Sequence, residues 1–403
     1  MVNIVNQNTF RADPLIDDVL EQARKLQPLI REHAAKGEDE RRVVQPVIDA
    51  MTRAGLFKIA TPRRYGGLES SMKSMLDLSA IVGEADGGTS WIVTLSNVCA
   101  WLTSLFPVSA QDEVFGKNPD AKVSGVLTPS ATSRRVDGGF IVNGKWFYNS
   151  GSWHADWAVL GLPVVNEAGE AVDQGLALFS CKELKLEETW FVAGMSSSGS
   201  NCLIAENVFV PDHRIMSVPA AIQGDYPTER KEEEALYRSA FVPLLALVLV
   251  GPQLGMGRAA LNFVLSKAPN KPVSYTFFNS QAQSTAFQLQ VAEAALLIDT
   301  AHLHAYRAAA DIDNAAIAGR YPDAMIRARV RADTGLVAEK ITRAIDILLF
   351  AHGSGGFANT SPLQRIWRDS AVAARHAVAL PQVGYEVYGK ALLGVKEQIT
   401  PLI

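Results

Sequence analysis

The first part of the chain carries apolar residues at the spacing of a helix. Between Leu20 and Ile30 they recur every three or four positions, which places them along one helix face. Gly55 follows a second run that ends at Ala54. A glycine commonly follows the end of a helix because it adopts a left-handed backbone at no steric cost. We therefore predict an N-terminal helical domain over residues 1–120.

The middle of the chain changes to short segments with a period of two. The segment VDGGFIVNGKWFYNSG alternates apolar and polar residues around two turn signals, Asp137-Gly138-Gly139 and Asn143-Gly144. Further short runs rich in β-formers follow it, separated by Gly, Asp, Asn or Pro. Such a series is typical of a compact sandwich or barrel, and we predict one over residues 121–225.

Helical periodicity returns in the last part of the chain, which we predict to be a helical bundle over residues 226–403. The segment HGSGGFANTSP is the clearest break between its helices. The longest apolar stretch, 241–251, contains Pro243 and is too short to span a bilayer. The pattern as a whole predicts a multidomain α+β fold that is helical at both ends.

Composition narrows the possible functions. The 38 basic and 42 acidic residues give a net charge of −4, so no basic excess favours nucleic-acid binding. The three cysteines, Cys99, Cys181 and Cys202, are far apart and odd in number, which argues against disulfides or a zinc pair. The histidines lack metal-ligand spacing. The N-terminus lacks the pattern of a signal peptide. We expect a cytoplasmic protein without a metal, a nucleic-acid partner or a membrane partner.

Four polar segments are candidates for ligand contacts. The aromatic residues of WFYNSGSWHADW, at 146–157, suit a flat heterocyclic ligand, or the rings enter the core. The hydroxyls of GMSSSGSN, at 194–201, suit an anion or a polar ring edge, or form a plain turn. GSGG at 353–356 is a weak phosphate-loop signal, and by itself it favours a flexible connection between helices. The arginines at 327, 329 and 331 are two apart, which favours a solvated helix face over a binding patch.

The order of several motifs resembles the acyl-CoA dehydrogenase superfamily over most of the chain. The motifs are RAGLFKIATPRRYGG, GGFIVNGKWFYNSGSWHADW, GMSSSGSN followed by NVFVP, and SPLQRIWRDS. The resemblance implies an N-terminal helical domain, a central β-domain and a C-terminal four-helix bundle that assembles homotetramers.

Three segments, NSGSWHADW, GMSSSGSN and SPLQRIWRDSAVAARHA, resemble the two-component flavin-dependent monooxygenases of that superfamily. The resemblance implies reduced FAD or FMN from a separate NAD(P)H flavin reductase, together with O₂, a C4a-hydroperoxyflavin and hydroxylation of an aromatic ring. The dehydrogenases place a glutamate base shortly after an arginine-aspartate pair. Counted from Arg368-Asp369, that position falls on Ala377, beside His376.

The resemblance assigns two catalytic residues. His376 would donate a hydrogen bond and move a proton, since an imidazole titrates near working pH. Ser150 would place its hydroxyl beside flavin N5. The expected cofactor contacts are Trp146, Asn149, Ser150, Gly151, Gly199, Ser200, Asn201, Phe277, Gly353 and Ser354, with the last two reaching a flavin across a subunit interface. The expected substrate contacts are Trp91, Cys99 and Ser124.

The chain departs from the family pattern at two positions. Ser274 stands where the dehydrogenases carry an arginine for the FAD pyrophosphate, which leaves FMN or FAD open. Cys99 stands where phenol hydroxylases place a histidine, which argues against a small phenol and for an indole-like or polycyclic ring. Three alternatives remain: an acyl-CoA dehydrogenase with a relocated base, an N-oxygenase of an amino sugar, and a non-catalytic scaffold on the same fold.

Overall fold

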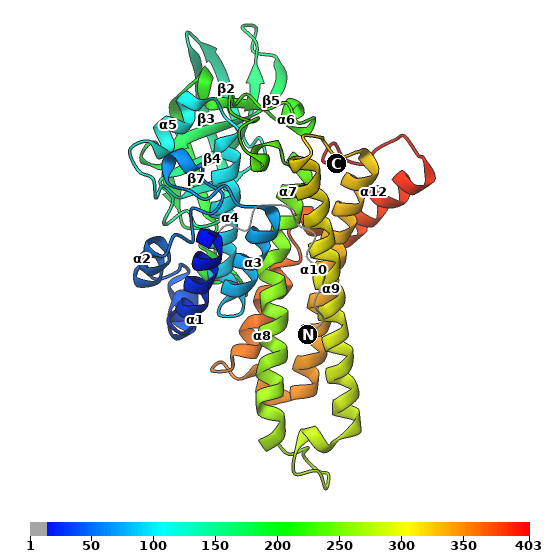
Figure 1. Ribbon diagram of the computed structural model, residues 1–403. Helices are drawn as coiled ribbons and strands as arrows, with labels where there is room; N and C mark the ends of the chain where they lie inside the picture. The colour runs from blue at the N-terminus through cyan, green and yellow to red at the C-terminus, as the bar shows by residue number, and fades with distance from the viewer. Residues whose placement is uncertain (1–13) are drawn as a thin grey trace.

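The computed structural model describes residues 14–403 (Figure 1). The N-terminal segment on which we expect no signal peptide lies outside these residues. The chain begins with five α-helices: α1 (Pro14–Glu40), α2 (Gln45–Arg53), α3 (Met72–Gly83), α4 (Gly87–Ser104) and α5 (Val108–Phe115). The apolar face predicted near Leu20 is the buried face of α1. Helix α2 ends at Arg53, and Gly55 follows with a φ of +75°, as expected.

Eight strands form two four-stranded sheets in the middle of the chain. The sheet orders are β1-β4-β5-β8 and β2-β3-β7-β6, and only the β1–β4 pair is parallel. A shared apolar cluster that includes Phe140, Trp146 and Phe179 draws on strands of both sheets. The strands are β1 (Val123–Val126), β2 (Ala131–Val136), β3 (Gly139–Asn149), β4 (Trp157–Val165), β5 (Ala171–Ser180), β6 (Lys185–Glu187), β7 (Asn201–Pro211) and β8 (Ile215–Ser217).

Only one of the two predicted hairpin turns is a turn. Asp137 and Gly138 join β2 to β3, whereas Asn143 and Gly144 lie inside β3. The register of β3 against β7 shifts there, which marks a β-bulge. A side chain at position 144 would come within 2.7 Å of the Trp146 ring. The glycine therefore serves close packing inside the sheet, and reading it as a second turn was wrong.

The last part of the chain is helical, as predicted. Figure 1 shows α8, α9 and α10 running side by side as the long helices of a bundle. The helices are α6 (Val218–Ile222), α7 (Phe241–Leu247), α8 (Gly251–Lys267), α9 (Thr285–Ile317), α10 (Ala324–His352), α11 (Pro362–Ala373) and α12 (Pro381–Leu393). The mixed α+β fold with helical ends is thereby confirmed. The boundaries near 120 and 225 stay predictions, because the apolar cluster of the helices also includes Val123 and Met216.

The apolar stretch that begins at Phe241 is longer than the sequence suggested. One helical run from Phe241 to Asn270 is long and apolar enough to cross a membrane by length and composition. Pro243 lies in the first turn of α7, where proline is tolerated, so it does not interrupt the run. Of the 18-residue window that passes this test, 78% is buried, and α8, which the run contains, packs against α3, α9 and α10. This burial is what a core helix of the bundle requires.

Candidate functional site

The two hydroxyl-rich segments singled out in the sequence meet at the end of β3. The Ser150 and Ser200 Oγ atoms lie 2.8 Å apart, and Ser200 Oγ lies 2.8 Å from Ser198 Oγ. The Gly151 N–H donates to the Ser198 carbonyl at 2.8 Å, and the Ser152 hydroxyl donates to the Gly199 carbonyl at 2.9 Å. We call Ser150, Ser198 and Ser200 the serine cluster.

Backbone conformation fixes the turns that carry the cluster. Gly151 has a φ of +73° and Gly199 a φ of +53°, a region that other residues adopt only with strain. Asn201 satisfies the turn: its Oδ1 accepts from the N–H groups of Thr189 and Trp190. Asn149 donates to the Trp146 carbonyl, but its own Oδ1 is buried without a partner. An unpartnered buried acceptor beside a hydroxyl is suited to a ligand N–H.

Trp91 of α4 links the two residues expected to be catalytic. Its indole N–H donates to Ser150 Oγ at 3.0 Å. Its ring lies 5.9 Å from the His376 imidazole, centroid to centroid, at an interplanar angle of 53°. The structure thus brings Ser150, Trp91 and His376 together from the β-domain, α4 and the segment after α11. We expected Trp91 to contact substrate. Its hydrogen bond and its ring contact place it between Ser150 and His376.

His376 is held as the neutral imidazole. Packing around the ring lowers its pKa to about 4, and the nearby Arg331 charge acts in the same direction. Its Nδ1 accepts from the Val378 N–H at 3.3 Å. Because Nδ1 is an acceptor, the proton of the neutral ring resides on Nε2. At neutral pH the side chain therefore offers one N–H donor that can also exchange its proton.

Arg331 contradicts the expectation of a solvated helix face. It is 3% exposed, and its Nη1 donates to the Val378 carbonyl. Arg329 pairs with Asp311 at 2.6 Å, and Arg327 donates to the Ile403 carbonyl. Helix α12 and the short 3₁₀ turn Ala377–Ala379 also pack against α10. The spacing of arginines within α10 carries no information about these distant segments. Sequence reasoning therefore missed Arg331 as a neighbour of His376.

Cys99 and Ser124 lie where α4 crosses β1. A side chain at Gly125 would come within 2.8 Å of Cys99 Sγ, so the thiol packs against this strand. Burial raises the pKa of Cys99 to about 12, which keeps the thiol protonated. Ser124 is buried, and its Oγ has no partner. Strand alternation turns Ser124 and Gly125 to opposite faces of β1, so Ser124 and Cys99 do not share one face.

Trp146 belongs to the core of the β-domain. It is fully buried, its indole N–H donates to the Gly161 carbonyl at 2.7 Å, and its ring packs against Phe179. Tyr148, two residues on, is 70% exposed with a φ of +69°, and meets Trp190 edge-on at 6.0 Å. Tyr148, and not Trp146, is therefore an aromatic residue of this segment with an exposed ring face. Strand alternation alone would have assigned both aromatics to one face.

Phe277, Gly353 and Ser354 lie elsewhere in the chain. All three are exposed, in the segments that follow α8 and α10. These segments are joined by Lys271, which donates to the His352 carbonyl, and by Gln281, which donates to the Ala351 carbonyl at 3.1 Å. Figure 1 shows this end of the bundle far from the β-domain. One chain therefore does not bring these residues to the serine cluster.

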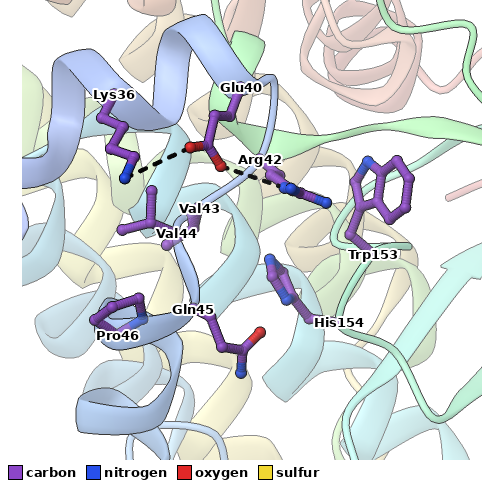
Figure 2. A pocket seen from close by; sticks show the side chains of 9 residues that line it. All are labelled: Lys36, Glu40, Arg42, Val43, Val44, Gln45, Pro46, Trp153 and His154. Carbon is purple, nitrogen blue, oxygen red and sulfur yellow. Dashed lines mark hydrogen bonds and ion pairs between the residues drawn. The ribbon is translucent and has the colours of Figure 1, made fainter.

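A cavity of about 350 Å³ lies between the α1–α2 connection and residues 153–154 (Figure 2). Glu40 pairs with both Lys36 and Arg42, at 3.7 and 3.5 Å, which offsets their charges. The Arg42 guanidinium lies over the Trp153 ring at 5.1 Å. These contacts hold the segment after Ser150 in place. The cavity is lined by Lys36, Glu40, Arg42, Val43, Val44, Gln45, Pro46, Trp153 and His154.

The donor set of the site fits a flat polar heterocycle. The serine cluster and the free Asn149 acceptor offer an edge for hydrogen bonds, and Tyr148 offers an exposed ring face. Within residues 14–403, no three His, Cys, Asp or Glu side chains gather closely enough to hold a metal ion. The polar side chains that the site presents are hydroxyl, indole and imidazole groups.

Comparison with known proteins identifies relatives along nearly the whole chain. Residues 18–115 match the family model for the acyl-CoA dehydrogenase N-terminal domain, and residues 247–381 match that for the C-terminal domain. The chain is 30% identical over 371 residues to the flavin-dependent monooxygenase, oxygenase subunit HsaA, of Rhodococcus jostii (strain RHA1). This match covers 92% of the chain and 97% of the relative.

Two further relatives are named with a reduced flavin. The FADH(2)-dependent resorcinol hydroxylase, oxygenase component, of Rhizobium sp. (strain MTP-10005) is 27% identical over 376 residues. That match covers 91% of this chain and 92% of the relative. The structure of XiaF from Streptomyces sp. in complex with FADH2 and glycerol is 34% identical. It covers 96% of this chain and 98% of that chain, with a TM-score of 0.90.

Proposed function

The chain belongs to the oxygenase components of two-component flavin-dependent monooxygenases with the acyl-CoA dehydrogenase fold, and we propose that it hydroxylates a flat aromatic or heteroaromatic ring between Ser150 and His376. The observation that carries this proposal is Trp91, which bonds Ser150 and packs on His376. It puts the two residues that the family resemblance selects into one site, although they lie in different domains.

Reduced FAD or FMN fits the donor set at the serine cluster. The Ser150 hydroxyl and Asn149 Oδ1 would hold the polar edge of the flavin ring, with Gly151, Gly199, Ser200 and Asn201 shaping the turns around it. Tyr148 would cover a ring face, in place of the buried Trp146. Bound reduced flavin supplies the electrons that activate O₂ for transfer of one oxygen atom to a ring.

The residues of this chain would order the site and move protons. The His376 Nε2–H would donate a hydrogen bond to a reacting oxygen and later pass or regain its proton. Trp91 keeps the Ser150 hydroxyl oriented, since its N–H occupies one acceptor position of Ser150 Oγ. Helix α4 is buried along almost its whole length, which would keep water from this side of the site and favour oxygen transfer to substrate over loss of H₂O₂.

An acyl-CoA dehydrogenase fits the site poorly. That reaction needs a carboxylate to remove a proton from substrate. Ala377 occupies the position where the family resemblance expects the glutamate, and Arg331 is the charged group that shifts the pKa of His376. The site therefore offers an imidazole in place of a carboxylate.

The α4–β1 contact supports an indole-like or polycyclic substrate. Cys99 is a protonated, buried thiol that offers a phenol oxygen a weak partner. A buried hydroxyl without a partner costs about 1–3 kcal/mol, so small phenols lose affinity here. An indole-like or polycyclic ring has no hydroxyl to bury beside Cys99, so it does not lose binding free energy there. Turnover of a small phenol such as resorcinol above indole would overturn this part of the proposal, and oxygenation of an amino sugar would replace it.

The partners complete the proposal. A separate NAD(P)H flavin reductase supplies reduced flavin to a cytoplasmic enzyme. Phe277, Gly353 and Ser354 would reach the flavin of a neighbouring chain in a homotetramer, since they lie exposed at the far end of the bundle. Light scattering of the active protein tests this assembly: a mass of four chains is expected, and an active 43.6 kDa monomer would exclude it.

One experiment tests the function directly. The protein is titrated with reduced FAD and reduced FMN under argon, and then supplied with ¹⁸O₂, a flavin reductase and an aromatic substrate panel. Tight binding of reduced flavin and ¹⁸O in a hydroxylated product are expected. A protein that holds only oxidised FAD and oxidises acyl-CoA would be a dehydrogenase, and one that binds neither flavin would be a scaffold.

A further inference from the structure

We propose that Arg331 is a positioning residue that fixes the orientation and the tautomer of His376. The proposal rests on the proposed function only for the role of His376 in the reaction. The link between the two residues is a feature of this chain by itself, because it runs from the Arg331 side chain on α10 through the backbone of Val378 to His376.

Two hydrogen bonds through Val378 connect Arg331 to His376, and we call this pair of bonds the clamp. Arg331 Nη1 donates to the carbonyl of Val378. The N–H of the same Val378 donates to His376 Nδ1 at 3.3 Å. His376 directly precedes the 3₁₀ turn Ala377–Ala379, and the N–H and the carbonyl of Val378 belong to consecutive peptide units of that turn. The bond from Arg331 to this carbonyl therefore restrains the turn, and through the turn the N–H that reaches the imidazole.

The clamp selects one tautomer. With Nδ1 accepting a hydrogen bond, the proton of the neutral ring resides on Nε2. A ring that lost the Val378 contact would populate both neutral tautomers and could rotate. The same contact also keeps the imidazole ring beside Trp91, at 5.9 Å between centroids.

Arg331 is a buried cation without a carboxylate partner among residues 14–403. It makes none of the ion pairs found there, and its Nε is also buried without a partner. Burying such a charge costs folding free energy, so its presence suggests a purpose other than stability. A methionine of similar length would fill the same space without that cost. The purpose that the contacts indicate is control of His376.

The other charged groups near His376 are engaged elsewhere. Asp333, on the same helix as Arg331, pairs with His304 and Arg307. Asp369 of α11 accepts from the Met195 N–H, and Arg375 donates to the Ala371 carbonyl. Arg331 is thus the cation whose field acts on the imidazole, and it opposes a second positive charge there.

Three variants separate the contributions of Arg331. Arg331→Met removes the charge and the donor, Arg331→Gln keeps a donor without the charge, and Arg331→Lys keeps both in a different shape. The readout is NMR of the full protein with isotope-labelled histidine, followed against pH, with the His376 signal assigned by its loss in His376→Asn. Nitrogen shifts report the tautomer, and the titration reports the pKa.

The expected result has a fixed sign. Removing a positive neighbour favours the imidazolium, so the pKa of His376 should rise by about one unit in Arg331→Met and Arg331→Gln. Arg331→Lys should stay close to wild type. The Nε2–H tautomer should give way to a mixture in Arg331→Met. As pH is lowered, the product formed per O₂ consumed should begin to fall at a higher pH in Arg331→Gln than in wild type, because His376 is protonated earlier.

The outcomes distinguish this inference from the proposed function. An unchanged pKa and tautomer in Arg331→Gln and Arg331→Met would overturn the positioning role, whatever happens to activity. Should Arg331→Met fail to fold, Arg331→Gln and Arg331→Lys decide by the same comparison. A shifted imidazole with unchanged coupling of oxygen to product would support the clamp and overturn the role of His376 in the reaction.

Discussion

Replacing Trp91 with phenylalanine isolates the bond on which the site depends. The change removes the indole N–H that donates to Ser150 Oγ at 3.0 Å, while keeping an aromatic ring near His376. Both Trp91 and Ser150 are buried, at 6% and 7% exposure. A bond of this kind contributes about 0.5–1.5 kcal/mol net. Because Ser150 Oγ keeps its Ser200 neighbour at 2.8 Å, we expect the lower half of that range.

The smaller ring adds a void, so the total loss of folding free energy should be about 1–2 kcal/mol. The effect on chemistry is separate. If a freely rotating Ser150 hydroxyl weakens the ordered site by about 1 kcal/mol, the ratio of product to H₂O₂ should fall about fivefold. The assay measures O₂ consumption, H₂O₂ and hydroxylated product together, with reductase and reduced flavin supplied.

Trp101→Phe is the matched control. Trp101 lies on the same helix, is fully buried, and its indole N–H donates to the Leu236 carbonyl at 2.9 Å. Trp101→Phe removes the same indole N–H as Trp91→Phe, but at a position that bonds neither Ser150 nor His376. We expect both variants to lose similar thermal stability, but only Trp91→Phe to release more H₂O₂. Equal release from both variants would refute the reasoning, because uncoupling would then follow from lost stability alone.

Three further changes test the neighbouring groups. Ser150→Ala should keep the fold but raise H₂O₂ release severalfold in the same assay, and an unchanged yield would reduce Ser150 to a turn residue. His376→Ala should lower coupled product at least tenfold with little change in melting temperature, as expected when one proton-transfer group is lost; wild-type coupling would dismiss its role. Burial, together with the charge of Asp86, raises the pKa of Asp369 to about 8, so the folded state holds a proton that the unfolded state releases near pH 4. The free energy of unfolding should therefore fall as pH rises from about 4 to 8. In Asp369→Asn, which can still accept from the Met195 N–H, melting temperatures should fall less over this pH range. Melting temperatures of variant and wild type that change in parallel with pH would contradict the raised pKa.

The sequence predicts the site to the extent that its chemistry lies in short segments. Ser150 and Ser200 stand out because hydroxyls and glycines cluster locally, and His376 because it adjoins a recognisable motif. Those segments need no knowledge of tertiary packing to be noticed. That the structure then joins Ser150 and His376 through Trp91 follows from helix packing, which no local pattern encodes.

The misjudged residues share one physical cause. The environment of Arg331 is set by α12 and a turn far away in sequence, so the spacing of arginines on its own helix carried no information about its burial. Trp146 and Tyr148 belong to one aromatic run, but a positive φ at Tyr148 breaks the strand alternation between them. The Asn143-Gly144 pair has the composition of a turn and serves as a bulge, because Trp146 needs the space.

The pairing of β3 with β7 has a consequence for how the chain tolerates change. The last pair of this ladder joins Asn149 to Asn201, and the serine cluster begins directly beyond it. A strand that slips by one residue turns every side chain to the opposite face. A single insertion or deletion in β3 or β7 would therefore separate Ser150 from Ser200 without unfolding the sheet. Variation in the length of these two strands should be far less tolerated than substitution along them, and flavin affinity would serve as a gauge of strand alignment.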